Sequence, residues 1–175
     1  MSYKQRLPKI TTFIFDVDGV LTNGSVILDS SGEMVRTMHT KDGYALQHAV
    51  KKGYNIVIIT GGNSIMVKKR LEGLGIRDVF LAVHDKLPVM NKYLKENQIN
   101  NQEVLYMGDD IPDFPCLKEV GVSTCPHDAA IEIREISEEY INTGLREMEK
   151  IFLKNEDLTL QINKLNLILV KKFKK

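Results

Sequence analysis

One short run of residues restricts the fold more than any other part of the sequence. Residues 11–15 read Thr-Thr-Phe-Ile-Phe, a β-branched and aromatic run with too little polar alternation for a strand buried on one face only. Strands that are apolar on both faces are typical of parallel sheets, because helices cover such sheets on both sides. The run therefore predicts a buried central strand and, with it, an α/β fold.

The rest of the chain shows the alternation of strands and helices that such a sheet requires. Three further apolar segments are predicted as strands, at residues 55–60, 79–83 and 104–107. Patterned segments of helical length lie between them, at residues 43–52, 63–74 and 86–97. This order predicts a doubly wound parallel sheet within a single domain that spans residues 1–154.

Two segments depart from this alternation. Residues 25–39 are predicted to form a β-hairpin whose strands are joined through Asp29-Ser30-Ser31-Gly32. An isolated two-stranded hairpin is marginally stable in water, so this apolar one is expected to pack on something, either another subunit or its own sheet. Residues 155–175 form a C-terminal extension that alternates Leu or Ile with polar residues, predicted as a helix or an edge strand and as a candidate oligomer contact.

The charge balance limits the classes of partner. The 24 Lys and Arg residues nearly equal the 23 Asp and Glu residues, so no net field draws the chain to nucleic acid or to an anionic membrane. There is no signal-peptide pattern and no stretch of about 18 apolar residues, so a cytoplasmic location is expected. Cys116 and Cys125 lack the spacing of zinc or redox sites and are expected to be reduced, structural thiols. A small molecule is therefore the expected partner.

Polar residues gather where three of the predicted strands end. Asp16-Val17-Asp18 follows the first strand, Thr60-Gly61-Gly62 ends the second, and Gly108-Asp109-Asp110 follows the strand at 104–107. In open α/β sheets, ligands bind beyond the carboxyl ends of the strands, near a topological switch point. The three segments are therefore expected to form one site.

Asp16 and Asp18 are a pair of carboxylates two positions apart. A calcium loop of the EF-hand type starting at Asp16 is excluded, because Val20 and Ile27 would stand where oxygen ligands are required. A phosphate monoester repels an attacking carboxylate, so a pair acting on phosphate needs a hard divalent cation, and Mg²⁺ suits an all-oxygen site. We expect Asp16 to attack phosphorus and form an aspartyl phosphate. Asp18 would protonate the leaving alkoxide and later deprotonate the hydrolytic water.

Two further segments offer groups that suit a phosphate. The hydroxyl of Thr60 and the N–H groups of Gly61 and Gly62 are placed to hold non-bridging oxygens, although a simple glycine turn explains the same residues. Lys86 begins a predicted helix and is a candidate cation for the transferring phosphoryl group, with a merely solvated lysine as the alternative.

A third segment places carboxylates close together. Asp109, Asp110 and Asp113 lie within five residues at a predicted strand end, where their mutual repulsion is costly unless a cation is present. A bound metal explains the cluster. Asp110 and Asp113 are also candidate helix caps, and a cap can at the same time hold a metal ligand in place.

Together these segments resemble the haloacid dehalogenase superfamily of phosphatases. The resemblance is carried by residues 16–22 (Asp-Val-Asp-Gly-Val-Leu-Thr), Thr60-Gly61, Lys86, and Gly108-Asp109-Asp110 with Asp113. It implies that Asp16 is the nucleophile, that Asp18 is the general acid and base, and that Thr60, Gly61 and Lys86 bind phosphate. It also implies that Mg²⁺ is bound by Asp16, Asp109 and the main-chain carbonyl of Asp18.

Within this superfamily, residues 8–153 are most similar to the 3-deoxy-D-manno-octulosonate 8-phosphate phosphatases. The likeness rests on the short length, the hairpin after Asp18, and Lys41-Asp42-Gly43 before the first long helix. It implies hydrolysis of a 3-deoxy-2-ulosonic acid phosphate, the absence of a large cap domain, and a homotetramer built through the hairpins. The candidate substrate contacts are Lys41, Asp42, Gly62, Lys68, Lys69 and Arg70.

The sequence differs from this family pattern in two places. Members often carry Arg where Gly62 stands, and the paired glycines of a conserved C-terminal motif are missing from residues 142–147. Three alternatives stay open: a nine-carbon sialic-type acid phosphate as substrate, phosphoryl transfer to a second sugar, and a non-catalytic oligomerisation module. His84 is expected to be exposed or structural, with the mouth of the pocket as its alternative place.

Overall fold

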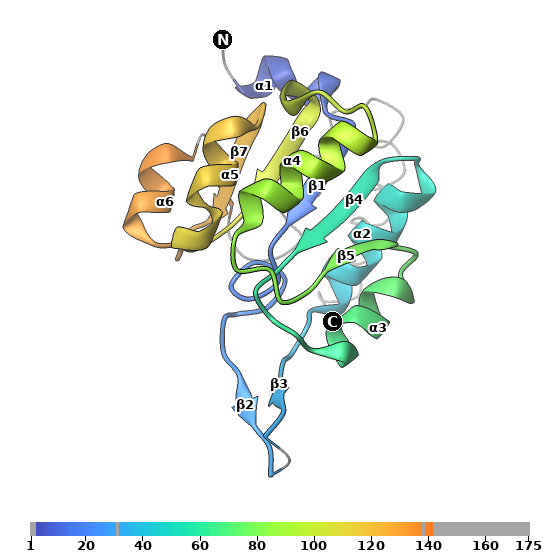
Figure 1. Ribbon diagram of the computed structural model, residues 1–175, viewed down its shortest axis with the longest axis vertical. Coiled ribbons are helices and arrows are strands. Elements are labelled where there is room, and N and C mark those ends of the chain that lie inside the picture. Colours follow the sequence, from blue (N-terminus) through green and yellow to red (C-terminus); the bar gives the residue numbers. More distant parts are fainter. Residues whose placement is uncertain (1–2, 31, 138, 142–175) are drawn as a thin grey trace, which may run out of the picture.

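The computed structural model describes residues 3–30, 32–137 and 139–141, and its centre is a parallel sheet (Figure 1). The sheet has six strands in the order β5-β4-β1-β6-β7-β8. The strands are β1 (Thr12–Phe15), β4 (Asn55–Ile59), β5 (Asp78–Phe80), β6 (Val104–Met107), β7 (Val122–Pro126) and β8 (Glu139–Ile141). The predicted α/β fold with a parallel sheet is therefore confirmed.

Helices cover both faces of this sheet (Figure 1). On one face lie α2 (Thr40–Lys51) and α3 (Ile65–Glu72), which contribute Leu46 and Leu71 to a core shared with Phe13 and Phe15. On the other face lie α4 (Lys86–Glu96), α5 (Phe114–Glu119) and α6 (Ile131–Ile136), packed on the opposite side of β1. Short helical turns complete the described chain: α1 (Tyr3–Arg6) and 3₁₀ helices at Leu7–Lys9, Asn101–Glu103 and Ile111–Asp113.

The predicted central strand occupies the centre of the sheet. β1 pairs in parallel with β4 on one side and with β6 on the other, so that Phe13 lies opposite both Ile56 and Leu105. All four residues of β1 are buried. Alternate side chains enter the two cores, which explains why the run has no polar face.

The element boundaries differ from the sequence prediction in one informative place. The strand predicted at 79–83 runs only from Asp78 to Phe80, because the chain then turns toward the end of β4. Ala82 adopts a left-handed backbone conformation with φ of 54°, and its N–H donates to the Gly62 carbonyl. The N–H of Val83 donates to the Thr60 carbonyl, so the turn is fixed against one of the expected phosphate-binding segments.

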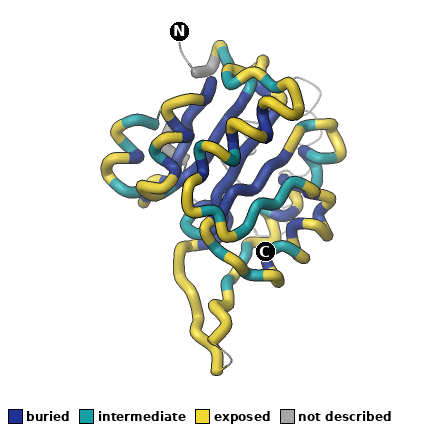
Figure 2. The backbone as a smooth tube through the Cα atoms, in the orientation of Figure 1, coloured by how far each residue is buried: buried dark blue, intermediate teal, exposed yellow. Residues whose placement is uncertain are grey.

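The hairpin predicted over 25–39 is present, with shorter strands than expected. Its strands are β2 (Ile27–Leu28) and β3 (Met34–Val35), which pair antiparallel. The hairpin projects from one end of the molecule, and its residues are exposed along nearly their whole length (Figures 1 and 2). The hairpin is therefore a small projecting arm and not a large cap domain.

Three further expectations concern the cysteines, the membrane and the tail. Cys116 and Cys125 are free and buried, in agreement with structural thiols. Within the described ranges, no helix combines the length and the apolarity needed to cross a bilayer. The extension at 155–175 and the divergent stretch at 142–147 lie outside the described residues, so their predicted roles stay predictions.

Candidate active site

The three polar segments meet at the carboxyl edge of the sheet. Asp16 directly follows β1, Thr60 directly follows β4, and Asp109 lies just beyond the end of β6. These strands are neighbours, and β1 is the point at which the strand order reverses, with β4 and β5 on one side and β6 and β7 on the other. Such a switch point is where open α/β sheets bind ligands.

Asp16 is buried and is held at both carboxylate oxygens. The Val17 N–H donates to Asp16 Oδ1 at 2.6 Å, and Lys86 Nζ lies 2.7 Å from Asp16 Oδ2. Burial raises the pKa of Asp16, and repulsion from Asp113 raises it further, while the Lys86 ammonium partly opposes both effects. The carboxylate is therefore fixed in orientation before a substrate binds, and Lys86 alone does not offset the cost of its negative charge.

Asp113 links Lys86 to the backbone of the loop that follows β6. Its Oδ1 accepts from Lys86 Nζ and from the Tyr106 hydroxyl, both at 2.7 Å. Its Oδ2 accepts from the N–H groups of Asp109 at 3.2 Å and Asp110 at 3.4 Å. A Cβ at Gly108 would collide with the Asp113 side chain, so only glycine permits this approach. Although burial disfavours its ammonium, Asp113 and Asp16 raise the pKa of Lys86, which stays charged.

The carboxylates of Asp16, Asp109 and Asp113 form a group that fits a divalent cation. Oxygen atoms from these three residues lie within 4.8 Å of one another. Asp113 already accepts four hydrogen bonds, from Lys86, Tyr106, Asp109 and Asp110, so its lone pairs are largely engaged. Asp109 Oδ1, in contrast, is buried and has no hydrogen-bond partner among the described residues. The free capacity for a cation therefore lies on Asp16 and Asp109.

The first loop after β1 supports this arrangement from the other side. Gly19 has a φ of 80°, and a Cβ at this position would overlap the Asp109 carboxylate. The backbone of the Asp16–Gly19 loop thus closes onto Asp109, as expected where main-chain groups share a site with a carboxylate. Asp18 directs its side chain elsewhere and does not join the carboxylate group.

Burial and the neighbouring carboxylates Asp16 and Asp113 raise the pKa of Asp109 to about 7. Two anionic carboxylates this close together are costly without a cation, and a bound divalent ion reverses the effect by favouring their ionised forms. The donor set consists of oxygen atoms only, which is the ligand preference of Mg²⁺.

This pKa predicts a pH-dependent stability for the metal-free protein. Between about pH 4, where an ordinary Asp ionises, and about pH 7, folded Asp109 binds a proton more tightly than the unfolded chain does. The free energy of unfolding is therefore expected to fall as the pH rises through this window. Mg²⁺ binds the ionised form, so its stabilising effect should grow over the same range.

Thermal melts in chelator and in excess Mg²⁺, taken from about pH 5 to about pH 8, check this expectation. Asp109→Asn should remove most of both effects. A stabilisation by Mg²⁺ that does not change with pH would contradict the assignment of Asp109 as a metal-binding carboxylate.

Thr60 and the two glycines after it form a fixed turn. The Thr60 N–H donates to the Phe80 carbonyl, and Thr60 Oγ1 accepts from the Gly62 N–H at 3.1 Å. The Thr60 hydroxyl proton is left to donate to a ligand, and Gly61 is exposed next to it. Thr60 is itself buried, so Gly61 is the accessible part of this turn, and phosphate binding here stays a prediction.

Arg36, like Tyr106, is a residue of this region that the sequence does not predict. Its Nε lies 2.7 Å from Asp18 Oδ1, and its Nη2 lies 2.8 Å from Asp18 Oδ2. Arg36 follows β3 and belongs to the hairpin, eighteen positions beyond Asp18. A charge separated by an irregular segment gives no periodic signal, so only the folded arrangement reveals the pair.

Five of the six predicted substrate contacts lie on α2 and α3 and not at the ends of the strands. Lys41, in the first turn of α2, and Lys69 are exposed, and Asp42 lies beside Lys41. Arg70 lies against the start of α2 at Gly43, and Lys68 forms a surface ion pair with Glu72. Gly62 is the one member of this set that the structure places beside Asp18 and Thr60.

Asp110 and His84 are both exposed. Asp110 Oδ1 accepts from the Ile111 N–H at 2.8 Å and caps the 3₁₀ helix Ile111–Asp113, which agrees with the capping alternative. His84 is exposed, two residues before Lys86.

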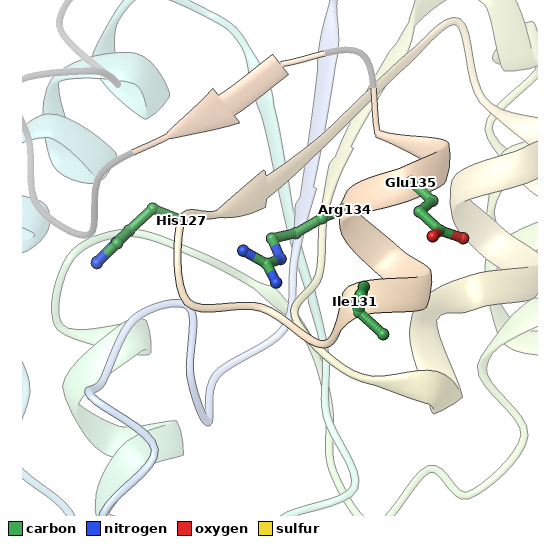
Figure 3. Close-up of a pocket in the computed structure, with 4 residues that line it drawn as sticks. All are labelled: His127, Ile131, Arg134 and Glu135. Carbon is green, nitrogen blue, oxygen red and sulfur yellow. The ribbon is translucent and has the colours of Figure 1, made fainter.

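A separate surface pocket of about 350 Å³ lies between β7 and α6. Its lining residues are His127, Ile131, Arg134 and Glu135, and Arg134 extends toward the loop that carries His127 (Figure 3). None of them belongs to the carboxylate cluster. The carboxylate cluster is therefore not part of this pocket.

Comparison with known proteins agrees with a hydrolase site at the carboxylate cluster. A family model described as haloacid dehalogenase-like hydrolase matches residues 32–126, just over half of the chain. The matched segment contains Thr60, Lys86 and Asp109.

Two curated relatives share one name, 3-deoxy-D-manno-octulosonate 8-phosphate phosphatase. The Haemophilus influenzae protein is 28% identical over 155 residues, which is 86% of each chain. The Yersinia pestis protein is 32% identical over 125 residues, which is 71% of this chain and 67% of the relative.

A solved structure from Moraxella catarrhalis, with the same name, superposes with a TM-score of 0.85 at 29% identity. The superposition covers 93% of this chain and 97% of the other. That protein was solved in complex with a magnesium ion, a phosphate ion and a KDO molecule.

Proposed function

Since this chain belongs to the haloacid dehalogenase-like hydrolases, we propose that it is a Mg²⁺-dependent phosphatase of a 3-deoxy-2-ulosonic acid phosphate. The favoured substrate is 3-deoxy-D-manno-octulosonate 8-phosphate, the compound named in its curated relatives. The observation that carries the proposal concerns two carboxylates at the carboxyl edge of the sheet. Asp16 is buried and oriented, and Oδ1 of Asp109 has no hydrogen-bond partner in the part of the chain that the structure describes.

Each residue of the site has a part in the proposed reaction. An oxygen of Asp16 attacks phosphorus as the bond from phosphorus to the sugar oxygen breaks, which leaves an aspartyl phosphate. Asp18 gives a proton to the departing alkoxide and then takes one from the water that hydrolyses the aspartyl phosphate. Lys86 and the Thr60 hydroxyl hold the phosphoryl oxygens in place.

The metal would be held by Asp16, Asp109 and the main-chain carbonyl of Asp18. When bound, Mg²⁺ supplies positive charge that offsets the repulsion between the phosphate and the carboxylates. Lys86 orients Asp16 and favours its ionised form, because its ammonium contacts Asp16 Oδ2 at 2.7 Å. Asp113 keeps Lys86 in that position through its own 2.7 Å contact.

A panel of phosphate monoesters tests the substrate assignment. It compares kcat/KM for the eight-carbon ulosonate phosphate, a nine-carbon sialic-type acid phosphate and common hexose phosphates, all with Mg²⁺. We expect the eight-carbon compound to be the best substrate. Equal values across the panel would overturn the ulosonate assignment but leave the phosphatase chemistry intact.

We also propose that the hairpin is an interface between copies of this chain, as in a homotetramer. Its exposed apolar side chains are Val26, Ile27, Leu28, Met34 and Val35. Ile27 and Leu28 are 63% and 72% exposed, an unusual exposure for adjacent large aliphatic residues on a strand. An arm of this composition gains most by packing on another subunit.

Light scattering after size exclusion tests this assembly. We expect wild type to elute as an oligomer, and Ile27→Asp with Leu28→Asp to elute as a smaller species. Ile131→Asp, on α6, is the matched control because Ile131 is 59% exposed but lies away from the hairpin. A monomeric wild type, or loss of assembly in the control alone, would contradict the proposal.

A further inference from the structure

The guanidinium of Arg36 connects the hairpin to the proposed acid and base. Nε and Nη2 contact the two oxygens of Asp18 at 2.7 and 2.8 Å, a bidentate arrangement that fixes the plane of the carboxylate. The third nitrogen, Nη1, donates to the Met34 carbonyl on β3 at 2.7 Å. Asp18 is thus joined, through one rigid planar group, to the backbone of the hairpin.

The backbone at Gly62 leaves room for this group. A Cβ built on Gly62 would lie 3.3 Å from Arg36 Nη2, 3.5 Å from Asp18 Oδ2 and 3.5 Å from Thr60 Oγ1. The pair therefore lies directly beside the proposed phosphate-binding turn, between the hairpin and the sheet edge. A substrate whose phosphate contacts Thr60 must place its leaving oxygen close to this pair.

We propose that Arg36 is a positioning residue that holds the Asp18 carboxylate toward the leaving-group oxygen and makes the hairpin part of the active site. The inference rests on the proposed phosphatase reaction. It goes beyond it by giving the hairpin a task within one subunit, independent of any subunit contact.

The geometry distinguishes this pair from an ordinary surface ion pair. Exposed pairs with single contacts contribute little, because two flexible side chains must be ordered for one weak interaction. Arg36 and Asp18 are both partly buried, and the guanidinium makes three short hydrogen bonds. The planar fork of Arg is what allows it to fix a carboxylate in orientation, which the single ammonium of Lys cannot do.

The step that depends on Asp18 identifies the expected effect. An alkoxide leaving group needs a proton as the bond to phosphorus breaks, whereas p-nitrophenolate is a stable anion and leaves without one. Asp18 carries that proton after it has deprotonated the hydrolytic water of the preceding turnover. Giving the proton up leaves the carboxylate that Arg36 contacts through Nε and Nη2, so the pair favours the transfer. A misplaced Asp18 should therefore slow hydrolysis of an alkyl phosphate more than that of p-nitrophenyl phosphate. A general loss of structure would slow both equally.

The test compares kcat for the two esters in wild type, Arg36→Ala and Arg36→Lys, with Mg²⁺ present. The alkyl ester is the ulosonate phosphate or, if wild type does not hydrolyse it, the best alkyl phosphate of the panel. We expect Arg36→Ala to lower the ratio of alkyl to aryl kcat by about 10-fold or more, and Arg36→Lys to restore part of it. Arg77→Ala is the matched control. Arg77 is exposed and directly precedes β5, so it lies at the amino end of the parallel strands, opposite the proposed site.

A double-mutant cycle with Asp18→Asn completes the test. If Arg36 acts through Asp18, removing Arg36 from the Asp18→Asn variant should not change the ratio further. An unchanged ratio in Arg36→Ala, equal losses on both esters, or additive effects in the cycle would each overturn the inference. A wild type without activity on either ester would instead remove the proposed phosphatase function, and this inference with it.

Discussion

Asp16→Asn is expected to abolish turnover of phosphate monoesters. Asparagine keeps the shape and the hydrogen bond from the Val17 N–H, but its amide is not a nucleophile for phosphorus. We expect kcat for p-nitrophenyl phosphate and for the best sugar phosphate to fall by roughly 10⁴-fold or more, because no other described group lies where it could replace the attacking oxygen.

The fold should survive this substitution. Burial and Asp113 raise the pKa of Asp16, so removing its charge relieves repulsion in the metal-free protein. Thermal melting in chelator is expected to show Asp16→Asn at least as stable as wild type. Asp128→Asn, at a carboxylate that is 57% exposed, is the matched control for activity. Residual turnover within tenfold of wild type would mean that another group is the nucleophile.

Lys86→Met is expected to have the largest effect on stability. Lys86 is 3% exposed and lies 2.7 Å from oxygens of both Asp16 and Asp113. Methionine fills a similar volume but leaves two buried carboxylates without their cation. The breaking of a buried ion pair from one side costs about 3–5 kcal/mol. Urea unfolding in chelator should therefore show a lower midpoint, and activity should fall because Asp16 loses its orientation.

A second substitution separates charge from packing in this prediction. Lys86→Met with Asp113→Asn removes one of the two unpaired carboxylates and should recover part of the lost stability. Lys92→Met, on an exposed face of α4, controls for the loss of a lysine from the same helix. If Lys86→Met and Lys92→Met unfold at the same urea concentration, the central role of Lys86 in this network is wrong.

The sequence predicts the elements whose residues carry a strong local pattern. β6 has the predicted bounds, and β1 and β4 differ from theirs by one residue, because each is a short apolar run with a polar residue at its end. β7 was missed, because Ser123 and Thr124 are polar and Pro126 is uncommon within a strand. The structure resolves this conflict: Thr124 Oγ1 donates to the Tyr106 carbonyl, so a polar residue is satisfied inside the sheet.

The residues of the candidate site also fall into two groups, those that the sequence pattern locates and those that it does not. Asp16, Thr60 and Asp109 could be located because each follows a recognisable strand, and the ends of parallel strands meet. Arg36 and Tyr106 could not, because only tertiary structure brings them to the carboxylates that they contact, Asp18 and Asp113. Tyr106 belongs to an apolar strand, and its hydroxyl finds Asp113 beyond the strand end. Its sequence context indicates nothing but a core residue.

The place of β1 in the sheet also has a consequence for how the chain is made. The strand is the first to leave the ribosome, yet both of its neighbours, β4 and β6, come later, the second ending only at Met107. Until then its apolar edges have no partner, which makes a nascent chain of this kind a candidate for chaperone binding. The residues of the proposed active site are also synthesised in this order, since Asp16 emerges early and Asp109 only after β6. A chain halted before that strand would contain Asp16 without Asp109, so it would lack the proposed metal site.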